Sequence, residues 1–271
     1  MAFKIGFQTD FPKDPVGVEN DVSAMSVPVP RKSVVEVAFF DEEVTYSYFN
    51  DRFDLKVGDR VYVEGRLEGN IGRVVSVNYN FKIKLSDYKK VIALVDTEVH
   101  GTFFNSSTHM ITFDPSVLPP QKASLWFKAP TDSEEEFVYS TDESTFLLEK
   151  LEGMKITSAI LERGLDYYTH NRIPYLSLDG THGYAIVKGS EAYEVEFEYA
   201  RGEISNIVCS CFCGYHCKHE VAVLLLLKEL LDTIEEHYKT DYEQTHSFVA
   251  MDKEVLFSYV LSGNNPCSVI L

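Results

Sequence analysis

The sequence lacks an apolar run long enough to cross a membrane. Its longest aliphatic stretch extends only from Val221 to Leu227, whereas a membrane-spanning helix needs about 20 apolar residues. The first residues, MAFKIGFQTDFPKDP, also lack a basic start followed by an apolar segment, so no signal peptide is predicted. Cysteines are few, five in 271 residues, and four of them are clustered, which argues against a disulfide framework. We therefore expect a cytoplasmic protein without a membrane partner.

Three sequence motifs of enzymes are also missing. No Gly-Lys dipeptide occurs anywhere in the chain, which excludes a phosphate-binding loop of the Walker type. The sequence HEVAV begins like a zinc-protease helix, but Val223 stands where the second histidine is needed. The His-x-Glu and Pro-Cys-x-x-Cys pair of zinc deaminases is absent too. We predict a non-catalytic protein and expect no small-molecule substrate.

Basic residues are scarce, 25 against 42 acidic ones, and the net charge is −17. Residues 51–90 are the exception, since they hold nine basic and six acidic groups and so carry +3, which leaves −20 for the rest. A phosphate-binding surface is therefore expected on the first half. Its candidates are Arg52, Arg66, Arg73, Lys82, Lys84, Lys89 and Lys90. Interleaved Tyr79, Phe81 and Tyr88 would stack on bases, unless they are core residues of a solvated barrel.

The length and the patterning favour an α+β protein with two domains. Residues 1–30 have no clear period and predict an irregular segment. Residues 31–148 contain short strand-like runs separated by Gly turns and predict a β-rich, barrel-like domain. These runs include FKIKL at 81–85 and ASLWFKA at 123–129. Residues 149–271 predict a small zinc-stabilised α+β domain.

Within residues 149–271 the sequence predicts a helix, an antiparallel meander and a closing helix. The helix is expected over residues 155–171, with Pro174 beyond its end. In the meander, apolar and aromatic residues alternate with glutamates from residue 193 to 199. One face of the sheet should therefore be exposed to solvent (wet) and the other apolar and buried (dry). The closing helix is apolar on every side from Val221 to Leu226 and is expected to cover the dry face.

Metal-binding side chains are crowded where the last strand of the meander meets this helix. Cys209-x-Cys211 ends the strand, and both sulfurs project from one face of an extended chain. Cys217 is expected at the start of the closing helix, and His219 is expected in the first turn of this helix. Three sulfurs and one nitrogen are a normal ligand set for one structural zinc ion. Cys213 and His216 lie in the gap between the two pairs, and either could replace a ligand.

The segment CSCFCGYHCKH resembles the SWIM-type zinc finger, whose pattern is Cys-x-Cys, a variable gap and Cys-x-His. The flanking segments LERGLDYYTHNRIPYLSLDG, VKGSEAYEVEFEY and CKHEVAVLLLL are similar to the helix, strands and closing helix around this finger. The resemblance covers roughly residues 150–235. It implies that Cys209, Cys211, Cys217 and His219 hold zinc, and that the protein binds DNA or another protein.

The first half resembles, more loosely, the N-terminal DNA-binding barrel of the primosomal replication-restart helicase. The similarity covers roughly residues 34–77 and is carried by the segment VEVAFFDEEVTYSYFNDRFDLKVGDRVYVEGRLEGNIGRVVSV. We predict an adaptor that joins a zinc-stabilised module to a β-rich domain and binds DNA or a protein partner. Residues 150–271 carry −8, about −9 with three thiolates and one zinc ion, which favours a protein on that half. The alternative is an accessory subunit or a redox-active thiol protein of an enzyme complex, with Cys213 as its reactive group.

Overall fold

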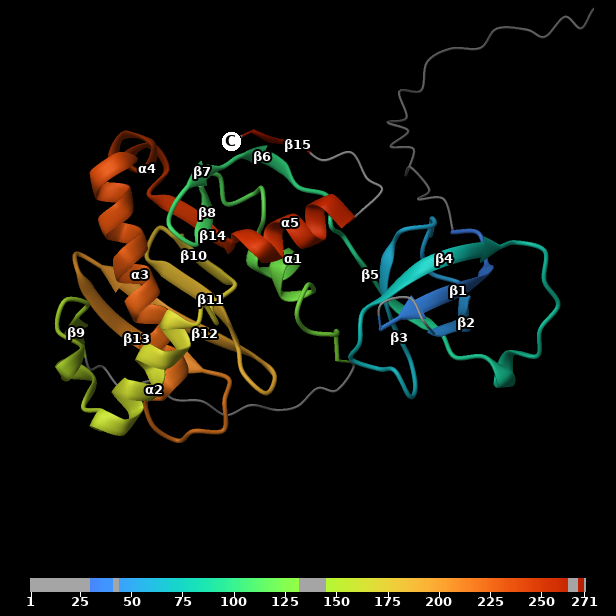
Figure 1. The fold of residues 1–271 in the computed structure, drawn as a ribbon, viewed down its shortest axis with the longest axis horizontal. Coiled ribbons are helices and arrows are strands. Elements are labelled where there is room, and N and C mark those ends of the chain that lie inside the picture. Colours follow the sequence, from blue (N-terminus) through green and yellow to red (C-terminus); the bar gives the residue numbers. More distant parts are fainter. Residues whose placement is uncertain (1–29, 41–43, 132–144, 263–267, 271) are drawn as a thin grey trace, which may run out of the picture.

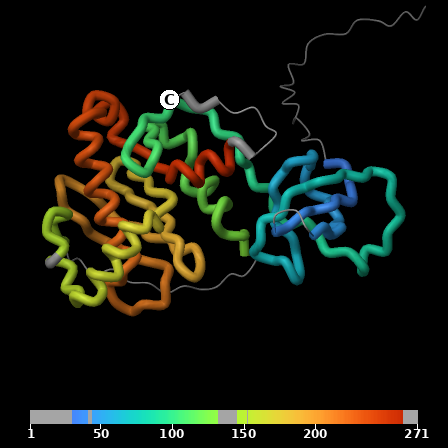
Figure 2. The backbone as a smooth tube through the Cα atoms, viewed as in Figure 1, coloured from blue at the N-terminus to red at the C-terminus, as the bar shows by residue number. Residues whose placement is uncertain are grey.

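The computed structural model describes residues 30–40, 44–131, 145–262 and 268–270. The expected irregular segment 1–30 lies, except for residue 30, outside these residues, and so does Cys267. The described chain forms two antiparallel sheets, a small one next to a larger α+β unit (Figures 1 and 2). The expectation of a mixed, strand-rich α+β fold is confirmed.

The small sheet has the strand order β2-β1-β4-β3-β5 and is open. Its strands are β1 (Ser33–Phe39), β2 (Val44–Asn50), β3 (Arg60–Val63), β4 (Gly72–Asn78) and β5 (Val91–Val95). No ladder of described residues joins the first and last strands in this order, β2 and β5; an isolated bridge links Phe49 of β2 to Lys90, the residue before β5. The expected barrel is therefore wrong, because one bridge does not make the continuous ladder that closes a barrel.

Two of the expected strands are not strands in the structure. Residues 81–85 run without regular structure into a short 3₁₀ helix, η1 (Leu85–Asp87). Residues 123–129 contain the end of α1 (Pro120–Ser124) and the turn after it. Pro120 at the first helical position has the backbone angle that a helix start requires. Neither segment belongs to a strand of the described sheets.

The larger sheet has eight strands in the order β7-β8-β14-β10-β11-β12-β13-β9. The strands are β7 (Phe104–Asn105), β8 (His109–Thr112), β9 (Phe146–Leu147), β10 (Tyr175–Asp179), β11 (His182–Lys188), β12 (Ala192–Ala200), β13 (Glu203–Cys209) and β14 (Ser247–Asp252). A separate parallel pair joins β6 (His100–Thr102) to β15 (Ser268–Ile270). The large sheet thus draws β7, β8 and β9 from before residue 148, so the boundary expected at 148/149 runs through it.

One face of the large sheet is covered by α3 (Lys218–His237), against which α2 (Ser158–Thr169) packs. The other helices after β9 are η2 (Leu151–Met154), α4 (Lys239–Thr245) and α5 (Lys253–Ser262). Alternate sheet residues, among them Val195, Phe197 and Phe248, form one core with the buried side of α3. Each fully buried aliphatic side chain contributes about 1.5–3 kcal/mol. The expectation that the closing helix covers a dry face is confirmed.

The opposite face of this sheet is covered as well, although it was expected to be wet. Tyr175, Ile186 and Met251 point to this side and pack with Trp126 and Leu256 in a second core. Of the alternating glutamates of β12, only Glu196 is exposed, while Glu194 and Glu198 are half-buried. The expectation was wrong because the covering segments, residues 96–131 and α5, come from distant parts of the sequence.

A stack of three side chains connects the small sheet to α5 and to the turn that follows α1. Trp126 and Tyr259 have parallel rings with centroids 4.5 Å apart. The guanidinium of Arg60, on β3, lies 4.4 Å from the centroid of the Tyr259 ring, and it donates a hydrogen bond to the carbonyl of Ser258. A cation over an aromatic face is an attractive contact, so α5 links the small sheet to the larger unit.

Candidate metal centre

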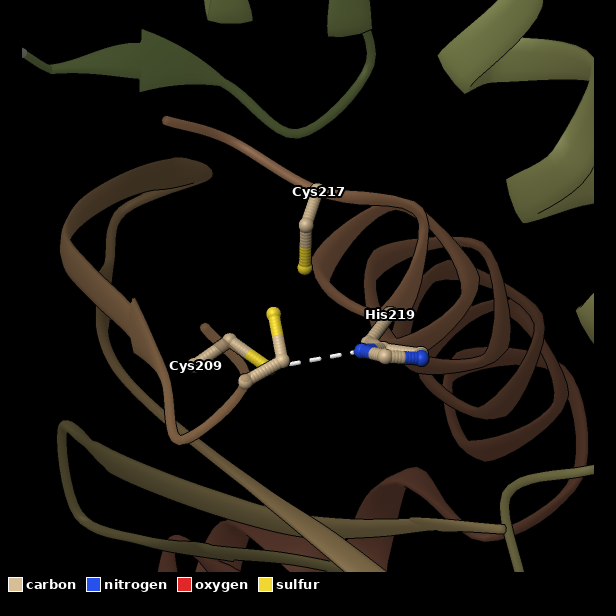
Figure 3. A group of neighbouring side chains, drawn as sticks. Cys209, Cys217 and His219 are labelled. Carbon is tan, nitrogen blue, oxygen red and sulfur yellow. Dashed lines mark hydrogen bonds between the residues drawn. The ribbon is translucent and has the colours of Figure 1, made fainter. Parts of the chain in front are cut away.

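Four predicted ligands come together where β13 ends and α3 begins. Cys209 is the last residue of β13 and Cys217 is the residue just before the first turn of α3, which contains His219. Figure 3 shows Cys209, Cys217 and His219 directed toward one another from these two elements. One ligand atom from each of Cys209, Cys211, Cys217 and His219 lies within 4.8 Å of every other. The group could hold a metal ion.

The distance between Cys209 and His219 fits a tetrahedral centre. Metal–sulfur and metal–nitrogen bonds of about 2.3 and 2.0–2.1 Å place sulfur and nitrogen about 3.6 Å apart at the corners of a tetrahedron. The Cys209 Sγ to His219 Nδ1 distance is 3.6 Å. All four donor atoms are already near one another, so a small adjustment of the cysteine side chains would complete the geometry.

His219 is buried, and one of its two ring nitrogens has no partner among the described residues. The residue is 4 % exposed, and its Nε2 makes no hydrogen bond within the described residues. The Tyr193 ring of β12 stacks on the imidazole at 4.4 Å with an interplanar angle of 19°. The other ring nitrogen, Nδ1, faces Cys209 Sγ, so Nδ1 is the atom that a metal ion among the sulfurs would bind.

Burial and a hydrogen bond between two thiols govern the pKa values of these donors. Burial, with a smaller effect from the charge of Lys218, lowers the pKa of His219 to about 4, so the imidazole is neutral at neutral pH and able to bind a metal. Burial raises the pKa of Cys211 to about 12. The pKa of Cys217 is raised first by its hydrogen bond with Cys209 and then by burial. A divalent cation among the sulfurs reverses this preference, because it binds the thiolate form.

Glu220 supports the centre, and the sequence analysis missed it. Its carboxylate is buried, accepts the backbone N–H of Cys217 at 3.2 Å, and lies 2.8 Å from Nδ1 of His216. The signal was present as a glutamate three residues after the residue that starts the helix, the capping-box spacing. His216 is thus engaged with Glu220, and neither His216 nor the exposed Cys213 belongs to the four-residue group.

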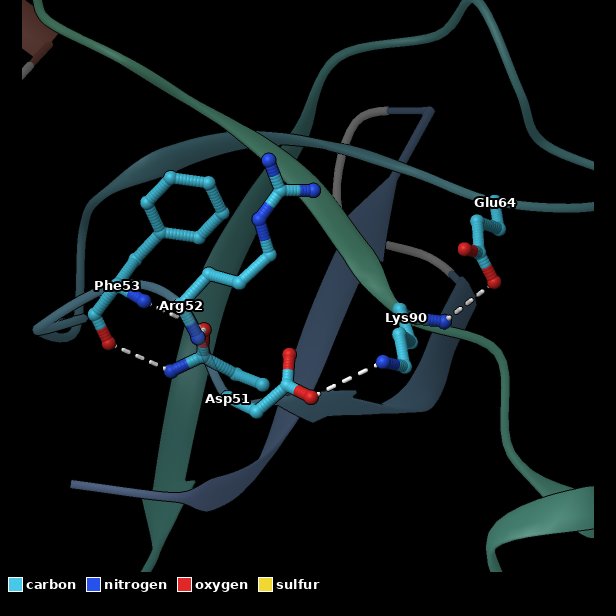
Figure 4. A network of polar contacts seen from close by, with 6 residues as sticks. Asp51, Arg52, Phe53, Glu64 and Lys90 are labelled. Atoms are coloured by element: carbon cyan, nitrogen blue, oxygen red, sulfur yellow. Dashed lines mark hydrogen bonds and ion pairs between the residues drawn. The ribbon is translucent and has the colours of Figure 1, made fainter. Parts of the chain in front are cut away.

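The predicted nucleic-acid residues lie on the small sheet and its connections, but they differ in exposure. Arg52, Arg66, Lys82, Lys84 and Lys89 are exposed, whereas Arg73 and Lys90 are half-buried. The Nζ of Lys90 lies 3.0 Å from Asp51 Oδ2, and its backbone N–H reaches Glu64 (Figure 4). Lys90 is therefore neutralised within the sheet, and the exposed members remain the candidates for phosphates.

The aromatic residues expected to stack on bases are half-buried. The ring of Phe81 packs edge-on against Phe49, with centroids 6.1 Å apart. The guanidinium of Arg31 lies 4.4 Å from the centroid of the Tyr79 ring. Lys82 and Tyr88 help to line a polar hollow of about 290 Å³ beside β1 and β4. These contacts give the aromatic rings a structural role, and stacking on bases stays a prediction.

Comparison with known proteins adds nothing to this geometry. No family model matches the chain, and no curated protein and no solved structure was found to match it. Within the described residues, no helix is both long enough and apolar enough to cross a membrane. The interpretation of the centre therefore rests on its own residues.

Proposed function

We propose that the protein is a non-catalytic adaptor whose larger unit is stabilised by one structural zinc ion. The observation that carries the proposal is the closed group of three sulfurs and one imidazole between β13 and α3. Four protein ligands leave no open position on a tetrahedral zinc ion for substrate or activated water. Zinc would connect the end of the sheet to the start of its covering helix. A reducing cytoplasm, which keeps such thiols free for metal, is the proposed location.

The proposed partner is a protein or DNA. The spacing of the four ligands and the helix–meander–helix arrangement around them support a SWIM-type finger, a module implicated in both kinds of binding. The exposed cations of the small sheet, Arg52, Arg66, Lys82, Lys84 and Lys89, support contact with a phosphate backbone. A role in DNA transactions would use this sheet for DNA and the larger, acidic unit for a protein.

The test is metal analysis of the full-length protein purified without added metal. The proposal expects one zinc per chain, and chelation at neutral pH should lower the stability of the larger unit, because structural zinc contributes folding free energy directly. Zinc should restore the stability of the chelated sample, whereas magnesium, which prefers oxygen ligands, should not. A chain without zinc that melts identically with and without chelator would contradict the proposal.

A second candidate function is favoured by the exposure of Cys213 beside the metal group. An accessible thiol next to three others could react with an oxidant and make the protein a redox-active subunit. Thiol titration of the metal-bound chain separates the two functions. An adaptor should show rapid reaction only outside the four-ligand group, and a redox protein should lose metal and form disulfides when oxidised mildly.

A further inference from the structure

A groove of about 740 Å³ lies on the face of the large sheet opposite α3. Its floor comes from β10, β11, β12 and β14, and its wall from α1 and the chain on both sides of α1, coloured light green in Figure 1. Its size is within the range of ligand sites in proteins. No residue of the groove belongs to the metal group. The groove is thus a separate feature.

One wall of the groove is rich in proline. Its apolar part consists of four prolines and two aliphatic side chains, namely Pro115, Pro119, Pro120, Pro130, Leu125 and Ala129, which alternate with polar residues such as Gln121. Proline has a fixed backbone angle, so this wall needs little ordering when a ligand binds. A surface of this kind fits the aliphatic stem of a long side chain.

The floor of the groove is acidic. The lining residues include three carboxylates, Asp179, Glu194 and Glu196, and one ammonium group, Lys128, which gives −3 + 1 = −2 with His182 neutral. Lys128 is already held by Glu194, with Nζ 3.5 Å from Oε2. Lys128 is therefore already paired with Glu194 of the floor.

Glu194 is fixed, and Glu196 is free to bind. Glu194 Oε1 accepts hydrogen bonds from Tyr184 at 2.8 Å and from Ser124 at 3.2 Å. Glu196, two residues further along the same strand face, is exposed, and its carboxylate has no hydrogen bond or ion pair among the described residues. The groove thus combines an anchored anion at its floor with a second carboxylate directed to solvent.

From this arrangement we propose that the groove binds an arginine- or lysine-bearing peptide segment of a partner protein. The aliphatic stems of the basic side chains pack on the proline wall, and their charged ends pair with Glu196 and Asp179. Nucleic acid does not fit, because its phosphates would meet a negative floor. The inference extends the proposed adaptor role by naming the chemistry of the protein partner, and it does not require metal to touch the groove.

The experiment uses the full-length, metal-bound chain and a fluorescein-labelled nonapeptide in which four arginines alternate with leucine and glycine. Fluorescence anisotropy at low ionic strength should show saturable binding that weakens as salt rises. The same peptide with glutamate in place of arginine should not bind. Absence of binding by the arginine peptide would overturn the inference, and measured zinc content keeps this failure distinct from failure of the metal proposal.

Two matched pairs of variants locate the site. Glu196→Gln should weaken peptide binding about two- to fivefold, as expected for loss of one exposed ion pair, while Glu203→Gln, at an exposed position of β13, should leave binding unchanged. Gln121→Arg adds a cation to the groove wall and should weaken binding more, whereas Gln244→Arg, exposed on α4, should not. Equal effects within either pair would show attraction by net charge alone and overturn the assignment.

Spermine, used as a competitor, distinguishes a peptide from a small polycation. Spermine carries four positive charges but neither arginine stems nor leucine side chains that extend from a peptide backbone, so it should cover less of the proline wall and compete weakly. Competition by spermine as strong as that of unlabelled peptide would overturn the peptide assignment.

Discussion

The close approach of α2 to α3 allows a sharp test of the packing beside the metal group. Gly164 is buried in α2, and a Cβ placed there would lie 2.4 Å from Cγ1 and 2.5 Å from Cβ of Val221. It would also lie 3.1 Å from the carbonyl oxygen of Lys218, the residue before His219. Val221 is fully buried, so it has no free space to move into. Only glycine fits at this crossing without a shift.

The expected effect of Gly164→Ala follows from two opposing terms. Alanine favours a helix interior over glycine by about 1 kcal/mol, whereas overpacking of a core costs about 1–3 kcal/mol. We therefore expect a net loss of about 1 kcal/mol in the free energy of unfolding, which corresponds to a melting temperature lower by roughly 2–4 °C. Denaturant titration of the metal-bound chain, followed by circular dichroism, measures it.

A double variant and a control complete this test. Val221→Gly removes both side-chain atoms that the added Cβ would meet first, so the double variant with Gly164→Ala should be less destabilised than the sum of the two single changes. Gly214→Ala, where an added Cβ meets no atom within 4 Å, should leave stability nearly unchanged. A Gly164→Ala protein that is more stable than wild type by about 1 kcal/mol, the helix-propensity gain alone, would refute the close approach.

Three further predictions concern the metal group, the basic residues and a buried histidine. His219→Ala should abolish stoichiometric metal binding and unfold the larger unit, whereas Cys213→Ser should change neither the metal content nor the stability. Metal analysis and melting curves of the two variants measure these effects. An unaltered melting curve for His219→Ala would contradict the structural role of the centre. If the small sheet binds DNA, Arg66→Glu with Lys82→Glu should remove a gel shift seen at low salt, since both are exposed; a shift that persists would assign DNA binding elsewhere. Burial lowers the pKa of His109, so the unfolded chain binds a proton at this residue at a higher pH than the folded chain does. The free energy of unfolding should therefore fall, by up to about 1.4 kcal/mol per pH unit, as pH drops below about 6.5. His109→Gln should show a shallower decline in urea titrations at a series of pH values, and a slope identical to that of the wild type would contradict this prediction.

The metal group could be predicted from sequence because its geometry is local. Two cysteines spaced by one residue at a strand end share a face, and the next ligand pair falls at a helix start, so four donors converge within eleven residues. The buried side of α3 was predictable for the same reason, since the stripe of Leu227, Leu230 and Ile234 is encoded within one helix. Local periodicity is enough where an element and its neighbour along the chain make the contact.

The rest of the fold depends on contacts between distant segments. β8 pairs with β14, placing Thr112 opposite Val249, and no local pattern specifies that partner. The glutamates of β12 alternate as on a solvated strand, yet Glu194 is held by Ser124 and Lys128 of the segment that covers this face. The barrel expectation failed similarly, since the pattern of short strands does not state whether the two edges of a sheet form a ladder.

X-ray absorption spectroscopy at the zinc edge of the full-length protein, purified without added metal, tests the central claim most directly. The account predicts one zinc ion with three sulfur ligands at about 2.3 Å and one nitrogen ligand at about 2.0 Å, supplied by Cys209, Cys211, Cys217 and His219. Four sulfur ligands would place Cys213 in the centre instead of His219. A spectrum with oxygen ligands, or a sample that holds no zinc, would contradict a closed structural site.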